Sequence, residues 1–155
     1  MLALLVLGLA FAGCRSGRKN DTGTAARFYL ETGPGEIAVP VVLPRSGVRV
    51  MVASKPVLTE WDLVEAEVAE VEDGRCLALQ FTPEAAGALL RLSETYPNRR
   101  LVLLLDGIPA GVRVLDEPIV GGRMLVFVEK EDRELGRLAA RLKRGGTTPG
   151  RRTES

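Results

Sequence analysis

The chain has 155 residues, a formal net charge of +1 and no histidine. The lack of histidine removes the commonest general base and metal ligand, and it excludes Ser-His-Asp and Cys-His catalytic arrangements within this chain. The near-neutral charge balance gives no indication of nucleic-acid binding. About 140 residues follow position 14, which is enough for one domain with its own hydrophobic core.

The chain begins with the apolar run MLALLVLGLAFAGC. From Leu2 to Gly13 every residue is apolar or small, and about a dozen residues are too few for a membrane span, which needs roughly 20 in a helix. A short apolar run that ends in small residues is typical of a secretory signal peptide. We therefore expect residues 1–13 to be a signal peptide and the chain to be exported.

The end of this run, Phe11-Ala12-Gly13-Cys14, resembles the lipobox of bacterial lipoproteins. In that family the cysteine thiol receives a diacylglycerol, the preceding peptide is cleaved and the new amino terminus is acylated. The resemblance implies lipid attachment at Cys14 and a domain that faces the periplasm or the exterior beside a membrane. The sequence departs from the pattern in having Phe11 where leucine is usual and no Lys or Arg before the run. The alternative is a simple cleaved signal or an uncleaved anchor.

Two segments have the composition of flexible chain. Residues 14–26 hold Cys14 and the polar, aperiodic stretch RSGRKNDTGTAA, which is typical of a tether. Residues 145–155 (GGTTPGRRTES) have the same character and predict a disordered tail. The folded domain is therefore expected between them, over residues 27–144.

Two short strands are expected at the start of this domain. The first covers Arg27 to Glu31, and the second includes Val48, Val50 and Val52, which alternate in GVRVMVASKP. Alternation of this kind is typical of a strand with one buried face.

The next segment, WDLVEAEVAEVEDGR, fits both a helical face and a strand face. Its Asp73-Gly74 pair is a typical hairpin turn. We therefore favour a hairpin, preceded by a short turn or helix, with these limits: turn or helix 59–62, first strand 64–72, second strand 75–81.

Cys76 is the other of the two cysteines. In RCLALQF the large residues Leu77, Leu79 and Phe81 alternate on one face, which places Cys76 on the opposite face as a half-buried strand residue. A Cys14–Cys76 disulfide is the alternative if Cys14 carries no lipid.

Thr82-Pro83-Glu84 predicts the start of a helix, because Thr can cap it, Pro fits its first turn and Glu complements its dipole. The helix should end before Pro97, since the residue before a proline avoids helical geometry. Its buried face is expected to comprise Ala85, Ala86, Leu89, Leu90 and Ser93.

The segment LVLLLDG is apolar on both faces and predicts a central strand that is covered on both sides. Further strands are expected at 112–115 and 124–128, and a last helix from Glu131 to Gly145-Gly146. The order strands, helix, strands, helix predicts an α+β fold, a largely antiparallel sheet with two main helices packed on it. The buried face of the last helix should comprise Leu135, Leu138, Ala139 and Leu142.

Several motifs resemble one family in both order and spacing. FTPEAAGALLRLSETYPNRRLVLLLDG resembles the helix of SecD proteins that leads into a strand ending Leu-Asp-Gly, and IPAGVRVLDEPIVGGRM keeps that family's Glu-Pro-Ile-x-Gly-Gly motif. LGRLAARLKRGGTTP is similar to its closing helix, and PVLTEWDLVEAEV to its approach to the hairpin. The resemblance spans about residues 47–149 and points to the head part of the first periplasmic domain of SecD. The matched turn residues are Asp106, Gly107, Glu117, Pro118, Ile119, Gly121 and Gly122.

SecD acts with SecF in bacterial protein export, and its head is thought to hold emerging polypeptide while proton flow drives the cycle. This chain departs from the family because nothing after Gly13 could span a membrane, and the base beside the head is absent or reduced to residues 27–44. Gly111-Val112-Arg113 also stand where the family usually has Ser-Ala-Pro. The resemblance therefore implies a head-like module without a proton-driven motor.

No second acid or nucleophile accompanies Asp106 at a fixed spacing, so we interpret the motif residues as turns rather than catalytic groups. We expect no enzymatic activity, no metal and no cofactor. The first reading is a membrane-anchored lipoprotein that binds extended or translocating polypeptide, with unfolded secretory chains or Sec export components as partners. The alternative is a structural or adaptor lipoprotein that docks on a folded envelope protein.

Overall fold

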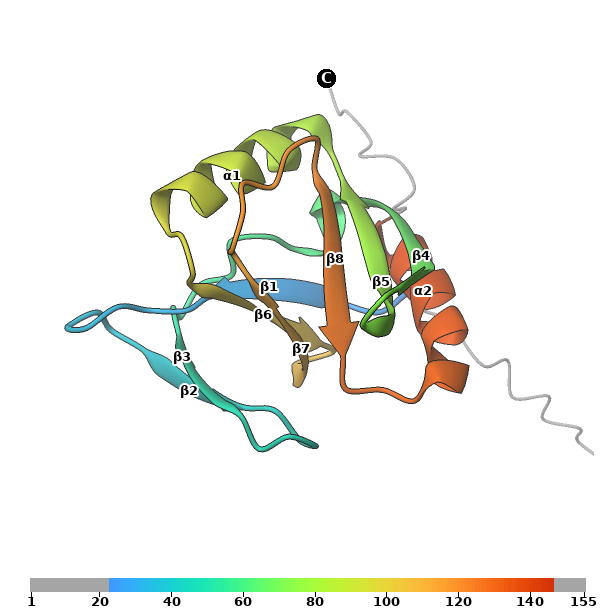
Figure 1. Cartoon of the computed structure of the whole chain (residues 1–155), viewed down its shortest axis with the longest axis horizontal. Coiled ribbons are helices and arrows are strands. Elements are labelled where there is room, and N and C mark those ends of the chain that lie inside the picture. Colours follow the sequence, from blue (N-terminus) through green and yellow to red (C-terminus); the bar gives the residue numbers. More distant parts are fainter. Residues whose placement is uncertain (1–22, 147–155) are drawn as a thin grey trace, which may run out of the picture.

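The computed structural model describes residues 23–146, which form eight strands, a short 3-10 helix and two α-helices (Figure 1). The expected signal peptide, the expected lipid attachment at Cys14 and residues 147–155 of the expected tail lie outside the described residues. The elements are β1 (Ala26–Leu30), β2 (Val39–Val42), β3 (Arg49–Val52), η1 (Glu60–Asp62), β4 (Leu63–Val71), β5 (Gly74–Phe81), α1 (Pro83–Thr95), β6 (Arg100–Leu105), β7 (Ile108–Val114), β8 (Arg123–Val128) and α2 (Asp132–Gly146).

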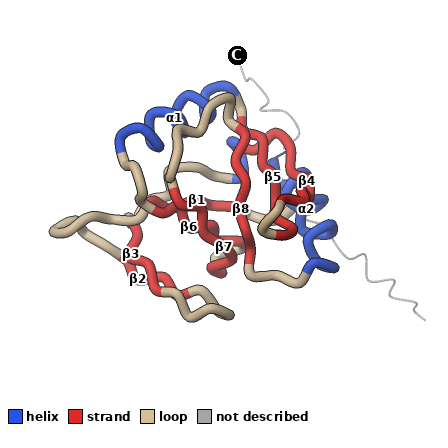
Figure 2. Tube along the Cα trace, viewed as in Figure 1, coloured by secondary structure: helices blue, strands red, loops and turns tan. Residues whose placement is uncertain are grey.

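Six strands form one antiparallel sheet in the order β1-β6-β7-β8-β5-β4, and β2 pairs with β3 in a separate two-stranded sheet. Figure 2 shows α1 and α2 beside the large sheet, with β2 and β3 set apart from both helices. The expected α+β architecture is confirmed. Strand β2 is an addition, because nothing in residues 39–42 indicates a strand without its partner β3.

The folded body extends beyond both ends of the expected range, residues 27–144. Thr24 and Ala26 are buried, so the folded part begins before Arg27 rather than after a tether that reaches residue 26. Helix α2 includes Gly145 and Gly146, where the tail was expected to begin. Both differences arise because the two ends contact each other: the Thr24 amide donates to the Arg141 carbonyl oxygen at 3.3 Å.

The hairpin of β4 with β5 is confirmed, with Val71 paired to Gly74 across the turn and η1 preceding it. Cys76 is fully buried rather than half-buried, because β5 is an inner strand and both of its faces are covered from Cys76 to Leu79. Burial raises the pKa of the Cys76 thiol, and the charge of Arg123 offsets this only in part. The thiol is therefore held in its unreactive protonated form.

Helix α1 begins as expected, with the Thr82 hydroxyl accepting a hydrogen bond from the Ala85 amide at 3.3 Å. Its last residue, Thr95, lies two positions before Pro97. Of its expected core residues, Ala85, Leu89 and Ser93 are buried, whereas Ala86 and Leu90 are half-buried. All four apolar residues expected on the buried face of α2 are buried.

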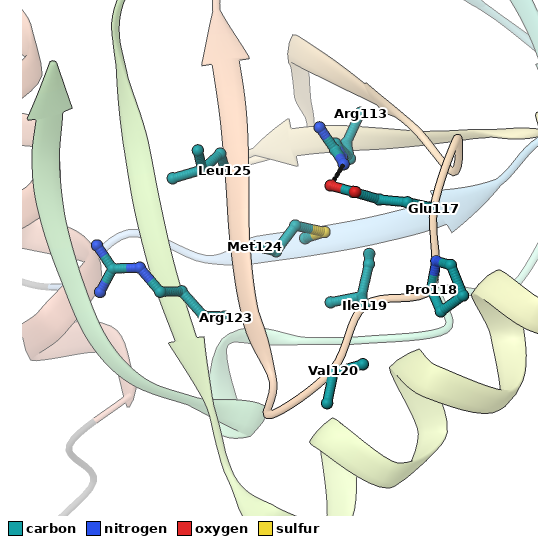
Figure 3. A pocket seen from close by; sticks show the side chains of 8 residues that line it. All are labelled: Arg113, Glu117, Pro118, Ile119, Val120, Arg123, Met124 and Leu125. Carbon is teal, nitrogen blue, oxygen red and sulfur yellow. Dashed lines mark hydrogen bonds and ion pairs between the residues drawn. The ribbon is translucent and has the colours of Figure 1, made fainter. Parts of the chain in front are cut away.

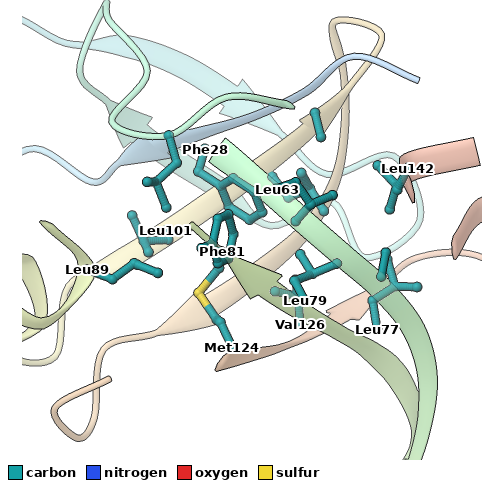
Figure 4. Close-up of a cluster of buried hydrophobic side chains, with 14 of the residues drawn as sticks. Phe28, Leu63, Leu77, Leu79, Phe81, Leu89, Leu101, Met124, Val126 and Leu142 are labelled. Atoms are coloured by element: carbon teal, nitrogen blue, oxygen red, sulfur yellow. The ribbon is translucent and has the colours of Figure 1, made fainter. Parts of the chain in front are cut away.

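The main hydrophobic core lies between the large sheet and the two helices (Figure 4). Phe28 of β1 and Phe81 of β5 meet there edge to face, with ring centroids 5.7 Å apart. Strand β6 contributes Leu101 and Leu103 to this core from one face. Residues distant in sequence therefore share a single packed interior.

The other face of β6 is covered by the two-stranded sheet. Val102 packs there with Val41 of β2 and with Val50 and Val52 of β3. This second layer explains why β6 is apolar on both faces, and it confirms the central strand expected at LVLLLDG. Strand β7 starts at Ile108 instead of residue 112, because it forms a hairpin with β6 directly after Asp106-Gly107.

A half-buried ion pair joins the end of β1 to the start of β6. The Glu31 carboxylate accepts hydrogen bonds from the Arg100 amide and Nε, each at 3.0 Å, and pairs with the Arg100 terminal nitrogen. The hydrogen bonds from the Arg100 side chain lower the pKa of Glu31 below 4.5, aided by the Arg100 amide and by the Arg99 charge, while burial opposes the shift.

We expect this pair to make stability depend on pH in the acid range. Because the Glu31 pKa is depressed in the folded state, its contribution is present above about pH 4.5 and is lost as the pH falls through the folded value. Thermal unfolding followed between about pH 7 and pH 3 should show Glu31→Gln less stable than the wild type at neutral pH, with the gap closing in acid. Glu72→Gln, an exposed residue, is the matched control and should show no such closing gap. A gap that stays constant with pH would contradict the assignment.

Candidate functional site at an open strand edge

The central feature of the candidate site is a gap in the sheet where β7 and β8 diverge. These two strands are paired only at Gly111 with Val128 and Val112 with Phe127, although β7 continues to Val114 and β8 begins at Arg123. On its other side β8 stays paired with β5 from Arg123 to Val126. The first half of β8 therefore has a neighbour on one side only.

The connection between β7 and β8, residues 115–122, passes beside this gap and is fixed by α1. The Ile119 amide donates to the Ser93 hydroxyl at 2.9 Å, and that hydroxyl also donates to the Leu89 carbonyl in the helix. The Ile119 side chain is buried. The conformation of the connection is thus set by a helix that lies outside the strand pair.

Gly121 and Gly122 end the connection, both with positive φ, at 71° and 69°. The Gly121 carbonyl accepts from the Gln80 side chain at 2.9 Å, and the Gly122 carbonyl accepts from the Phe81 amide at 2.9 Å. A left-handed backbone of this kind favours glycine. The conformation fits a turn at both residues, and the contacts join the connection to β5.

A cavity of about 390 Å³ lies between the connection and the open edge of β8 (Figure 3). Ile119 and Met124, both buried, supply apolar surface in it. The complete lining is Arg113, Glu117, Pro118, Ile119, Val120, Arg123, Met124 and Leu125.

The rim of the cavity carries charges of both signs. Arg113 pairs with Asp116 at 2.9 Å and with Glu117 at 3.4 Å, as Figure 3 shows for the second pair. The Arg113 Nε is buried and has no hydrogen-bond partner, so one donor of this side chain remains unused. Arg123 of β8 pairs with Glu67 of β4 at 3.0 Å, across the intervening strand β5. The rim can therefore contact charged groups of either sign.

The motif residues fall into two separate places. Glu117, Pro118 and Ile119 line the cavity, and Gly121-Gly122 follow directly, but Asp106-Gly107 lie at the opposite end of β7. Asp106 and Gly107 form the β6–β7 turn with φ values of 51° and 83°. The Asp106 carboxylate accepts from the Ala25 amide at 2.9 Å and from Arg141 at 3.2 Å. Its surroundings fit the expected structural turn.

Sequence reasoning did not place Arg113, Arg123, Met124 and Leu125 at a common site. Their strands show only the alternation of ordinary β-structure, and no local pattern indicates that a ladder will stop after two paired positions. Among residues 23–146, no group of three or more Asp, Glu, Cys or His side chains is placed to hold a metal ion. Within the same range, no helix has the length and apolar character of a membrane span.

No protein-family model matches this chain, and no curated protein matches it in sequence. Solved structures do match it in fold. A structure of SecDF in its super-membrane-facing form has a TM-score of 0.62 and 19% identity, covering 81% of this chain and 19% of that one. The fold is SecDF-like.

A second structure, of a membrane component SecDF that enhances protein export, has a TM-score of 0.62 at 18% identity and covers 83% of this chain. The match covers 66% of that protein, so this chain spans less than two thirds of either SecDF structure. At such low identity the likeness establishes the fold. The SecDF-like fold agrees with the resemblance drawn from the motifs between residues 47 and 149.

Proposed function

We propose that this chain is a lipid-anchored module of the bacterial cell envelope that binds extended polypeptide at the open edge of β8, without motor or enzymatic activity. The observation that carries the proposal is the early end of the β7–β8 ladder beside a cavity. The SecDF-like fold supports it, because one matching SecDF structure is described as a membrane component that enhances protein export.

The backbone direction of β8 supports strand addition at this edge. The Glu129 amide donates to the Ala110 carbonyl of β7 at 2.6 Å. Amide groups alternate between the two sides of a strand, so those of Leu125 and Arg123 also face the gap and point away from β5. These groups can pair with the backbone of an added strand, which is a way of binding that depends little on sequence.

The cavity beside the edge suits the side chains of such a strand. Every second side chain of an added strand would face the apolar surface of Ile119 and Met124, and the others would face the mixed-charge rim. The partners consistent with this are unfolded secretory chains, delivered by components of Sec export. Attachment through an acylated Cys14 would keep the module beside the membrane where such chains emerge.

Binding of a reduced, unfolded secretory polypeptide to the purified chain tests the proposal. We expect Leu125→Pro to weaken binding roughly tenfold or more, because it removes an amide that faces the gap and leaves the β5 ladder intact. Leu125→Ala is the matched control, since it keeps that amide, and it should bind within about threefold of the wild type.

Two further measurements keep this test decisive if the proline variant is destabilised. A short extended peptide should bind the wild-type chain and lose binding when alternate amides are N-methylated, because strand addition needs those amides. Photocrosslinks from position 113 or 117 should reach the bound peptide. Equal binding of the methylated and unmethylated peptides would overturn strand addition at this edge.

The anchor has a separate test. Mass spectrometry of the chain extracted from bacterial membranes should find a mature amino terminus at Cys14 that carries diacylglycerol and a further acyl chain. Cys14→Ser should release the chain from the membrane fraction. An unmodified chain free in the cytosol would overturn the proposed anchor. It would not bear on polypeptide binding at the β8 edge, which the peptide experiments test separately.

A second candidate function is docking on a folded envelope partner, and the outer side of the β2–β3 sheet favours it. Val42 and Met51 are exposed on this sheet, and Ile37, two residues before β2, is 89% exposed. A small apolar surface of this kind is typical of contact sites between proteins. One stoichiometric crosslinked partner from position 51, together with no binding of unfolded chains, would favour this function over the first.

A further inference from the structure

The chain enters the folded body beside the second half of α2 (Figure 1). The Thr24 amide donates to the Arg141 carbonyl, and the Asp106 amide donates to the Ala25 carbonyl. The Asp106 carboxylate accepts from the Ala25 amide and from the Arg141 side chain. The first described residue, Gly23, is therefore held next to the C-terminal half of this helix.

Two adjoining cavities lie at this place, with volumes of about 230 and 250 Å³. They adjoin because Lys130, Leu138 and Arg141 line both. The first also includes Thr24 and the apolar residues Leu105 and Pro109, and the second includes Arg137. Together they make a groove whose polar lining has three cationic side chains and three carboxylates, those of Asp106, Glu129 and Glu134, over an apolar floor.

The cations of this groove have few acidic partners. Among residues 23–146, neither Lys130 nor Arg137 forms an ion pair, and Arg141 forms one, to Asp106 at 3.2 Å. The Thr24 hydroxyl, in a residue only 1% exposed, has no hydrogen-bond partner. The groove thus contains two unpaired cations and one unused hydroxyl.

Two of the carboxylates that line the groove, those of Glu129 and Glu134, accept hydrogen bonds from backbone amides. Glu129 accepts from the Arg45 and Ser46 amides at 2.7 and 3.2 Å. Partial burial raises the pKa of Glu129, but the hydrogen bonds with Ser46 and Arg45 and the Arg45 charge outweigh it, so the pKa lies below its ordinary value. Glu134 accepts from the Glu131 amide at the start of α2, at 3.2 Å. In the described part of the chain, neither carboxylate forms an ion pair with Lys130 or Arg137, so these two cations can bind an anion from outside the chain.

We propose that this groove binds the phosphate headgroup of an anionic phospholipid in the bilayer that holds the chain. Arginine and lysine with a hydroxyl are suited to phosphate oxygens, and the apolar floor suits the glycerol and upper acyl carbons. The site rests on the proposed anchor at Cys14. Nine residues of chain reach at most about 30 Å, so an acylated Cys14 would keep the groove within that distance of the lipid surface.

The charges of residues 15–22, which join Cys14 to the folded body, favour the same partner. Residues 15–22 contain Arg15, Arg18 and Lys19 against one acid, Asp21. Basic residues near an anionic membrane surface each contribute about 1 kcal/mol of attraction, and attachment raises the effective concentration of the headgroups further. The anchor would then fix the orientation of the module, with α2 toward the membrane.

Vesicle binding by residues 15–155 tests the site. This part contains every residue of the packed core but not Cys14, so its result does not depend on acylation. We expect binding to vesicles of phosphatidylcholine mixed with phosphatidylglycerol, and no binding to phosphatidylcholine alone. The double variant Lys130→Gln/Arg137→Gln should bind roughly 30-fold more weakly, from two surface charges at about 1 kcal/mol each.

The matched control is Arg49→Gln/Arg91→Gln, which removes the same net charge from exposed arginines on β3 and α1. It should retain most of the binding. Equal weakening in the two double variants would mean diffuse charge attraction and would overturn the site, as would equal binding to neutral vesicles. Saturable binding of inorganic phosphate without vesicle binding would mean that the groove binds free phosphate, and it would overturn the proposal of a lipid headgroup. Unchanged melting temperatures of both variants would exclude unfolding as the cause.

Discussion

Phe28→Ala is expected to lower the free energy of unfolding by about 3–5 kcal/mol. Phe28 is 1% exposed and packs edge to face on Phe81, so its removal leaves a cavity that links β1, β5 and α1. Since a domain of this size has about 5–15 kcal/mol of stability in total, the variant should be near the limit of folding at 37 °C. Urea unfolding followed by circular dichroism measures the change.

Phe127→Ala is the control for this prediction, because Phe127 is the same residue type but 42% exposed on β8. It should lower the unfolding free energy by no more than about 1–2 kcal/mol, since less apolar area is returned to water. Similar losses for the two variants would contradict the location of the core between β1, β5 and the helices.

Gly122→Ala is expected to lower the free energy of unfolding by about 2–5 kcal/mol. Two effects add at this position. The backbone has φ of 69°, which an alanine adopts only with strain, and a Cβ at Gly122 would lie 2.6 Å from the Cβ of Ala86 in α1. Because this glycine joins the cavity loop to β5, the same change should also weaken polypeptide binding beyond the loss of stability.

Gly121→Ala separates the two effects. Its φ is 71°, but no atom lies within 4 Å of where its Cβ would stand. It should therefore show only the conformational strain, about 1–2 kcal/mol. Equal destabilisation at both positions would mean that the contact with Ala86 does not limit this site, and that α1 can move away from the loop without loss of stability.

The turn residues were the part of the site that sequence alone could indicate. Gly121, Gly122 and Asp106-Gly107 have a backbone conformation that their residue types prefer, so local chemistry suffices to place turns there. Glu117, Pro118 and Ile119 were found as a motif, but nothing local indicates that they line a cavity. That depends on Ser93 of α1, which binds Ile119 from 26 positions away.

The elements of the fold depended mainly on local information. Thr82 as a cap, the apolar spacing of α2 and the alternation in β4 and β5 are each determined by neighbouring residues, and each was predicted close to its observed limits. By contrast, the prediction that Cys76 is half-buried was wrong. The residues that cover the second face of β5 come from other parts of the chain, so the local sequence does not show that this face is buried.

The α+β order of elements, the hairpin turns and the apolar faces could be predicted, because they follow from residue preferences and from periodicity within a few positions. Three features are visible only in the folded structure: β7 and β8 separate after two pairs, β2 and β3 cover β6, and residue 24 meets α2. Each of these is a contact between segments far apart in the chain. Strand alternation is the same whether a strand has one neighbour or two, so no local pattern can reveal an open edge.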